Sequence, residues 1–203
     1  MAKSFSSFSK QNNFYSGYYS DRLSGSSSYS NNQILLGLND GYFGNEAWKN
    51  FDRWYSVDLS QEAVDMVNKN IALNKAENKM KAVCADVFDV LIDYEAKGEK
   101  FDLIILDPPA FTKNAKNIQK AYGGYKEINL RAMRLLSENG ILVTCSCSYF
   151  FDSEHFYGMI MKAAEDSKKR VQILAKYGAG PDHPVLAGYP KSEYLKCAVC
   201  RVL

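Results

Sequence analysis

The pattern of hydrophobic and polar positions changes near residue 33. From there on, short apolar runs of strand length alternate with amphipathic stretches of helical period, as in βαβ units. Several of the runs are apolar throughout, as central parallel strands are. The expected strands are Gln33–Leu38, Trp54–Asp58, Lys81–Ala85, Phe101–Asp107 and Gly140–Ser146.

Three stretches between or after these strands have one apolar face each. They predict helices over Gln61–Leu73, Lys126–Leu136 and Phe156–Ala164. After Arg170 the pattern becomes two strands, Val171–Lys176 and Tyr194–Val202, around a loop rich in glycine and proline. Together the elements predict an α/β fold with a doubly wound, Rossmann-like parallel sheet and an antiparallel C-terminal hairpin at its edge.

Residues 1–32 have no such period. They contain eleven serines and seven Phe or Tyr, with almost no aliphatic side chains. A segment of this composition cannot bury a core, so we expect a disordered tail over residues 1–32 and one folded domain over residues 33–203.

Charge and composition narrow the function classes. The net charge is +2, and the tail carries it: residues 33–203 hold 22 basic and 22 acidic side chains. Binding to a polyanion would therefore need a local patch. No apolar run is long enough to span a membrane, and the opening run MAKSFSSFSKQNN has no signal-peptide core. The five cysteines are expected to be free thiols in a cytoplasmic protein.

Candidate ligand-binding residues follow the strands, because ligands of such sheets bind at the carboxyl ends of the strands. Asp58 is placed to accept hydrogen bonds from ribose hydroxyls. Asp86 is placed to accept from an adenine amino group, with Phe88 or Val87 packing the ring. Helix capping is the alternative for both acids. The loop after the first strand contains Gly41, which would let the backbone approach a ligand.

The strongest candidate chemistry lies after the next two strands. Pro108 and the proline that follows it would hold Asp107 rigidly at the site. Cys145 and Cys147 end the fifth strand, where one can pack in the core and the other can emerge as a nucleophile. We expect no metal, because this Cys-x-Cys spacing is too tight alone and has no second ligand pair.

A basic strip over residues 112–134 has a local charge of +5. Lys113, Lys126 and Arg131 are its candidate RNA contacts, with Tyr122 and Tyr125 stacking bases and a hinge at residues 123–124. A solvated loop and helix face is the alternative.

The chain carries the runs FDLIILDPPAF (residues 101–111), YKEIN (125–129), GILVTCSCS (140–148), PDHP (181–184) and YLKC (194–197). In combination they resemble the large-subunit ribosomal RNA cytosine-5 methyltransferases, over roughly residues 54–203. The resemblance implies a class I methyltransferase sheet, S-adenosylmethionine as cofactor and ribosomal RNA as partner. It also implies that Asp58 binds the ribose of the cofactor, that Asp86 binds its adenine, and that Asp107 lies where the reaction takes place. The nucleophile it implies is Cys147, with Cys145 as the second candidate. Lys126 would contact RNA or stabilise the thiolate.

The chain departs from that family in two ways. The glycine loop reads Leu36-Gly-Leu-Asn-Asp-Gly-Tyr42, without the threonine that members usually carry. The family's N-terminal PUA and linking domains cannot fit in residues 1–32, so we expect the catalytic half alone, with a homodimer as a candidate assembly. Two other functions stay open: methylation of a base nitrogen, and a non-catalytic fragment that binds RNA or protein.

Overall fold

The computed structural model describes residues 32–36, 52–180 and 184–203 of the 203-residue chain. Of the tail expected over residues 1–32, only Asn32 is described, and it begins strand β1. The loop that contains Gly41 lies outside the described residues. Over the described residues, no helix is both long and apolar enough to cross a membrane.

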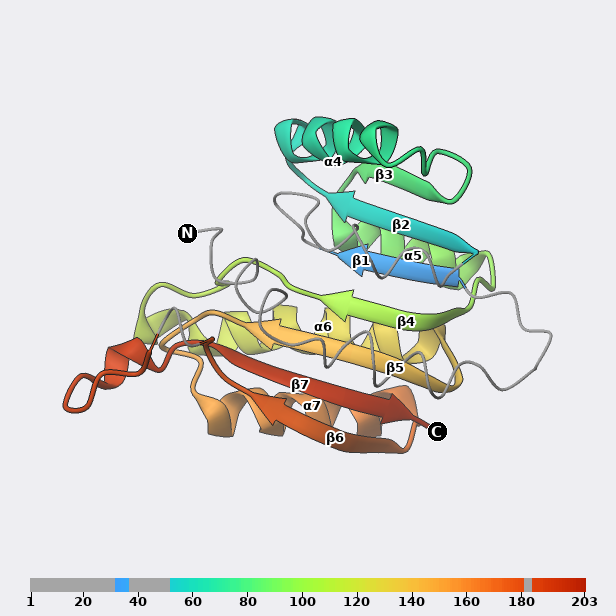
Figure 1. Cartoon of the computed structure of the whole chain (residues 1–203). Coiled ribbons are helices and arrows are strands. Elements are labelled where there is room, and N and C mark those ends of the chain that lie inside the picture. The colour runs from blue at the N-terminus through green and yellow to red at the C-terminus, as the bar shows by residue number, and fades with distance from the viewer. Residues whose placement is uncertain (1–31, 37–51, 181–183) are drawn as a thin grey trace.

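Strands and helices alternate along the described chain (Figure 1). The strands are β1 (Asn32–Leu36), β2 (Arg53–Asp58), β3 (Met80–Cys84), β4 (Phe101–Leu106), β5 (Leu136–Ser146), β6 (Val171–Tyr177) and β7 (Lys196–Val202). The helices are α4 (Gln61–Leu73), α5 (Val87–Ala96), α6 (Ile118–Leu135) and α7 (Ser153–Ser167), with short 3₁₀ turns at Ala115–Asn117 and Pro190–Ser192.

Within the described residues, seven strands form one sheet in the order β3-β2-β1-β4-β5-β7-β6. Strands β1 to β5 pair in parallel, whereas β7 is antiparallel to both β5 and β6. The predicted doubly wound sheet with a C-terminal hairpin is therefore confirmed. Within this hairpin, β7 pairs with β5 and β6 forms the edge of the sheet.

Burial explains this placement of the hairpin strands. Every residue of β7 except Arg201 is buried, so both faces of this strand need cover. Strand β6 exposes Gln172, Ile173 and Lys176 and tolerates an edge position.

Alternate side chains of the strands enter two cores on opposite faces of the sheet. Ile104 and Leu106 of β4 pack with α5, α6 and α7 on one face. Leu103 and Ile105 pack on the other face with Val67 and Ile71 of α4. Each fully buried aliphatic side chain of this kind contributes roughly 1.5–3 kcal/mol. These two cores fix the directions in which the strands end, and so the position of the residues that follow them.

Helix α7 is three residues longer at each end than predicted, and two other helices differ more. Helix α5 was not predicted: among its ten residues only Leu91 is fully buried, and its aromatic and β-branched residues lack a clear helical period. Helix α6 begins eight residues earlier than expected and includes residues 123–124, so the predicted hinge is wrong. Gly124 serves packing instead, because a Cβ there would lie 3.2 Å from the ring of Phe111.

Candidate active site

Acidic side chains follow three strands whose carboxyl ends lie at one edge of the sheet, where the arrowheads of β1 to β5 point in Figure 1. Asp86 comes after β3, Asp58 ends β2 and Asp107 comes after β4. Only β1 lies between β2 and β4, so at about 4.8 Å per strand Asp58 and Asp107 lie roughly 10 Å apart. The strand order reverses between β1 and β4, which is where ligands of open α/β sheets bind.

Asp58 and Asp86 also serve the backbone. Asp58 Oδ1 accepts a hydrogen bond of 2.7 Å from the N–H of Ser60, the residue that caps α4. Asp86 caps α5 itself, and its Oδ1 accepts from the N–H of Phe88 at 2.8 Å. Asp86 therefore does cap a helix, as the alternative interpretation predicted. In both residues the described part of the chain gives Oδ2 no hydrogen bond, so this oxygen can accept from a ligand. Val87 follows Asp86 as the first residue of α5 and is half-buried.

Asp107 is different, because the described residues give its carboxyl group neither a hydrogen bond nor an ion pair. The buried Pro108 follows it directly. Burial raises the pKa of Asp107 to about 7. A carboxyl group of this kind changes protonation near neutral pH, so it can donate a proton to a ligand or accept one.

The two candidate cysteines have different environments. Cys145 is fully buried, on the face of the sheet that α4 covers, and faces Cys197 of β7. Burial raises the pKa of its thiol well above the usual value, so it is a packing residue in this structure. Cys147 lies just beyond the end of β5 and is partly exposed.

The Cys147 sulfur lies beside the loop that begins with Asp107. Burial is the largest cause that raises the pKa of Cys147, and the negative charge of Asp107 is the second. The backbone N–H groups of Cys147 and Ala110 and the positive charge of Lys196 lower it. A thiol and a carboxyl group from two strand ends, 40 residues apart in sequence, therefore share one site.

A hydrogen-bond network joins the loops that carry these two groups. The hydroxyl of Tyr125, a fully buried residue of α6, accepts from Ser146 Oγ at 3.1 Å and from the N–H of Phe111 at 3.3 Å. The same hydroxyl donates to the carbonyl of Pro109 at 3.4 Å. Ser146 precedes Cys147, and Pro109 and Phe111 flank Ala110, so Tyr125 fixes the two loops against each other.

Further contacts hold the Cys147 loop from both sides. Ser148 Oγ donates to the carbonyl of Thr112 at 2.8 Å, and the Ser148 N–H donates to Ser146 Oγ at 3.4 Å. On the other side, Lys196 Nζ donates to the carbonyl of Ser148 at 2.6 Å. Sequence reasoning missed these roles for Tyr125 and Lys196. A signal for Lys196 was present, since Lys196 and Arg201 are the two charged residues of the otherwise apolar strand β7.

The basic strip is divided by the structure. Lys113, at its start, is exposed near the site. Lys126 forms an ion pair of 2.8 Å with Asp166 of α7. Tyr125 is buried, so it cannot stack bases as predicted.

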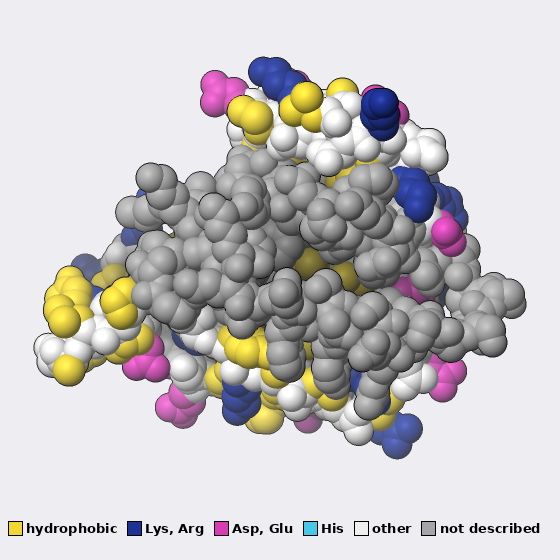
Figure 2. All heavy atoms as spheres, in the orientation of Figure 1, with side chains coloured by type: hydrophobic (Ala, Val, Ile, Leu, Met, Phe, Trp, Pro, Cys, Tyr) yellow, Lys and Arg dark blue, Asp and Glu magenta, His cyan; other side chains and the backbone are white. Residues whose placement is uncertain are grey.

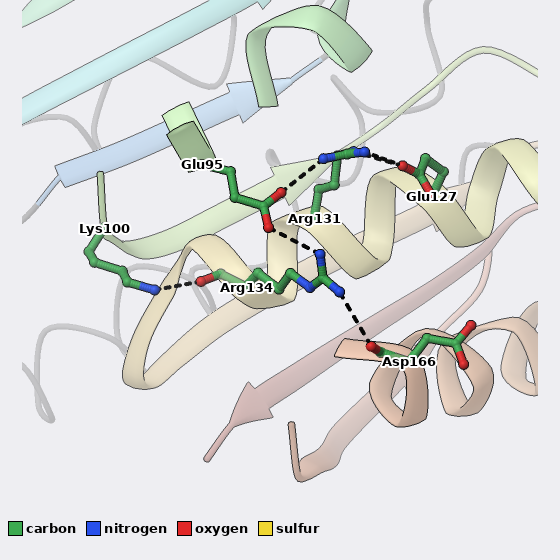
Figure 3. Close-up of polar contacts among 6 residues, drawn as sticks. All are labelled: Glu95, Lys100, Glu127, Arg131, Arg134 and Asp166. Atoms are coloured by element: carbon green, nitrogen blue, oxygen red, sulfur yellow. Dashed lines mark hydrogen bonds and ion pairs between the residues drawn. The ribbon is translucent and has the colours of Figure 1, made fainter. Parts of the chain in front are cut away.

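Arg131 lies in the C-terminal half of α6 and belongs to the group of charged residues drawn in Figure 3. Its guanidinium pairs with Glu95 at 2.9 Å and with Glu127 at 2.6 Å. Three residues later, the carbonyl of Arg134 accepts from Nζ of Lys100, which immediately precedes β4. Lys100 precedes β4 and Asp107 follows it, so about seven strand residues at about 3.3 Å each lie between them. The end of α6 that contacts Lys100 is therefore roughly 20 Å from Asp107.

An exposed apolar loop extends beyond the same edge of the sheet. It connects β6 to β7 and carries the exposed side chains of Val185, Leu186 and Tyr189. Yellow, hydrophobic spheres gather at this protruding part of the molecule, at the left of Figure 2. Tyr149, two residues after Cys147, is exposed as well.

A family model described as Conserved hypothetical protein 95 matches residues 41–149. The chain belongs to this family. The matched range includes every candidate cofactor-binding and catalytic residue from Gly41 to Cys147, and it ends before the C-terminal hairpin that contains Lys196.

The chain is also similar to curated and solved proteins. It is 46% identical over 149 residues to "Ribosomal RNA large subunit methyltransferase I" of Escherichia coli (strain K12), over 73% of this chain and 38% of that protein. The predicted resemblance is thus confirmed. The chain spans about two fifths of the length of the curated relatives that it matches.

Two solved structures share the fold. One is a putative SAM-dependent methyltransferase from Streptococcus mutans, with a TM-score of 0.71 and 22% identity over 91% of this chain and 48% of that one. The other, a putative methyltransferase in complex with SAH, has a TM-score of 0.70 at the same identity and coverage. The class I methyltransferase fold expected from the resemblance is confirmed by these likenesses.

Proposed function

We propose that this chain is an S-adenosylmethionine-dependent methyltransferase that transfers a methyl group to carbon 5 of a cytosine in ribosomal RNA. One observation carries the proposal: the thiol of Cys147 lies against the loop that holds the carboxyl group of Asp107. A thiol and a carboxyl group in one site are what cytosine needs for activation at carbon 5. The name of the curated relative, a ribosomal RNA methyltransferase, supports RNA as the substrate.

The strand-end acids fit the proposed cofactor. Asp58 and Asp86 each present a carboxylate oxygen that the described residues leave without a hydrogen bond, at neighbouring strand ends. Such oxygens accept hydrogen bonds from ribose hydroxyls and an adenine amino group. Three acids along one edge also suit a positively charged sulfonium. The bound cofactor would supply an electrophilic methyl group. Gly41, which lies outside the described residues, stays a predicted cofactor contact.

Cys147 and Asp107 then have separate roles in activating the base. The Cys147 thiolate adds to carbon 6 of the cytosine, and the Asp107 carboxyl group protonates the ring nitrogen that gains electron density. Carbon 5 becomes nucleophilic as a result. After methylation, a base removes the carbon-5 proton, and the bond between carbon 6 and the Cys147 sulfur breaks. The ring nitrogen then returns its proton to the Asp107 carboxylate. The cytosine must leave any base stack to reach these groups.

RNA would approach over the exposed start of the basic strip. Lys113, Lys116 and Lys120 are exposed, and the described residues give none of them an ion pair. Lys126 and Arg131 are engaged with acidic side chains. We therefore assign the phosphate contacts near the site to the three lysines.

The test is the variant Cys147→Ala in the full chain, with Cys84→Ala as a matched control, because Cys84 is an exposed thiol at the end of β3. Transfer of a labelled methyl group to ribosomal RNA should stop in Cys147→Ala and continue in the control. Calorimetry should show unchanged binding of S-adenosylhomocysteine by both variants. Full activity of Cys147→Ala would refute the proposal, and methyl groups on a base nitrogen would favour the other chemistry.

A further inference from the structure

Lys196 is a buried lysine for which the described residues supply no counter-ion. Lys196 is the first residue of β7 and is 5% exposed. Nζ donates to the carbonyls of Ser148 at 2.6 Å and Tyr194 at 2.9 Å, which uses two of its three protons. Among the described residues, no carboxylate lies within ion-pair distance of Nζ, and none accepts the third proton. Burying a cation in this way is costly unless a negative charge appears nearby.

The strand register places this cation beside the Cys147 loop. Lys196 pairs with Ser146 across β5 and β7, and its ammonium group binds the carbonyl of Ser148. It therefore contacts the chain on both sides of Cys147. The negative charge of a Cys147 thiolate would stabilise the ammonium, and the ammonium would stabilise the thiolate.

We propose that Lys196 is a positioning residue whose ammonium group stabilises the thiolate of Cys147. The inference rests on the proposed function for the substrate that the thiolate attacks. The stabilisation of the Cys147 thiolate by the Lys196 ammonium does not depend on that proposed function. Burial lowers the pKa of Lys196 to about 8, so at pH 7 it is still charged when the thiol ionises. The thiol proton passes to the carboxylate of Asp107, and Lys196 keeps its own protons.

Other ionisable groups also lie near Cys147 and Lys196 and influence the pKa values of these two residues. Asp107 after β4, Tyr125 of α6 and Cys145 of β5 act near Cys147. Asp152 and Glu193 act near Lys196 at longer range. Asp107 raises the pKa of Cys147, so Lys196 opposes the strongest unfavourable charge at the sulfur.

The experiment measures alkylation of Cys147 by iodoacetamide across pH, which requires neither cofactor nor RNA. It uses the full chain with Cys84→Ser, because Cys84 is exposed, and Cys147→Ala gives the blank. Lys196→Met should slow alkylation at pH 7 by about 10-fold or more, since a close opposite charge shifts a pKa by about one unit or more. At pH 10 the rate should stay within about 2-fold of the parent, because Lys196, with a pKa of about 8, is then neutral in the parent as well.

Lys176→Met is the matched control, because Lys176 is an exposed lysine of the same hairpin whose ammonium lies over the ring of Tyr157. This variant should keep the parent profile. Equal rates at pH 7 for Lys196→Met and the parent would overturn the inference. A proportional loss of rate at pH 7 and pH 10 would also overturn it, since that result means altered access to the sulfur.

Lys196→Arg decides the matter if Lys196→Met fails to fold, as circular dichroism would show. Arginine keeps the charge at every pH in the experiment, so alkylation at pH 7 should stay within about 3-fold of the parent. A larger loss would refute the role of the charge. Failure here would leave the methyl-transfer assay of Cys147→Ala unaffected, so the two proposals can fail separately.

Discussion

Removing the hydroxyl of Tyr125 should loosen the contact between the Asp107 and Cys147 loops and destabilise the fold. In Tyr125→Phe the hydrogen bonds to Ser146, Phe111 and Pro109 are lost together. A net protein hydrogen bond contributes about 0.5–1.5 kcal/mol, and the lengths of 3.1–3.4 Å favour the low end of that range. Three such bonds give a loss of about 2 kcal/mol. For a chain of this size that corresponds to a fall in Tm of about 6 °C.

Urea unfolding followed by circular dichroism measures this loss, with Tyr122→Phe as the matched control. Tyr122 lies one helical turn earlier in α6, is half-buried, and contacts the ring of Phe151. The described residues give its hydroxyl no hydrogen bond, so its removal should change the free energy of unfolding by less than about 0.5 kcal/mol. If Tyr125→Phe were no less stable than Tyr122→Phe, Tyr125 would not join the loops as argued.

Two further predictions concern charge. The pKa of Asp107 is raised to about 7, so between about pH 4 and 7 the folded state binds more protons than the unfolded state and stability falls as pH rises. Asp107→Asn should flatten this dependence, by up to about 4 kcal/mol across the window in urea titrations, and an unchanged slope would contradict the assignment. Lys113→Gln should weaken RNA binding about 3-fold at low salt without changing the stability, whereas Arg131→Gln should cost about 1 kcal/mol of stability and leave the RNA dissociation constant unchanged. If Arg131→Gln instead weakened RNA binding and left the stability unchanged, Arg131 would be an RNA contact.

The strand ends could be predicted from the sequence because local patterns determine them. The apolar run before Asp107 specifies a buried parallel strand, and the two prolines after it stop that strand. The same reasoning found the strands that end near Asp58, Asp86 and Cys147. Each residue needs only its own neighbours in the chain for this placement, and the parallel sheet then brings the strand ends to one edge.

Charge along the sequence was a poorer guide, because partners on other elements do not appear in a local count. The strip over residues 112–134 counts Glu127 as its single acid. In the fold, Glu95 of α5 and Asp166 of α7 pair with Arg131 and Lys126 respectively. Helix packing therefore neutralises the part of the strip that lies along the body of the sheet, and it leaves the lysines nearest the site unpaired within the described residues.

The relation between the two reactive loops depends on residues that no local pattern selects. Tyr125 belongs to the buried face of a helix, where an aromatic residue normally signals packing alone, yet its hydroxyl reaches both loops. Lys196 is placed by an antiparallel register with Ser146, 50 residues earlier. A change in that register by a single residue would turn the lysine to the opposite face of the sheet. The chemistry proposed for Cys147 thus depends on the order of the last two strands, because only an interior β7 brings a lysine beside the end of β5.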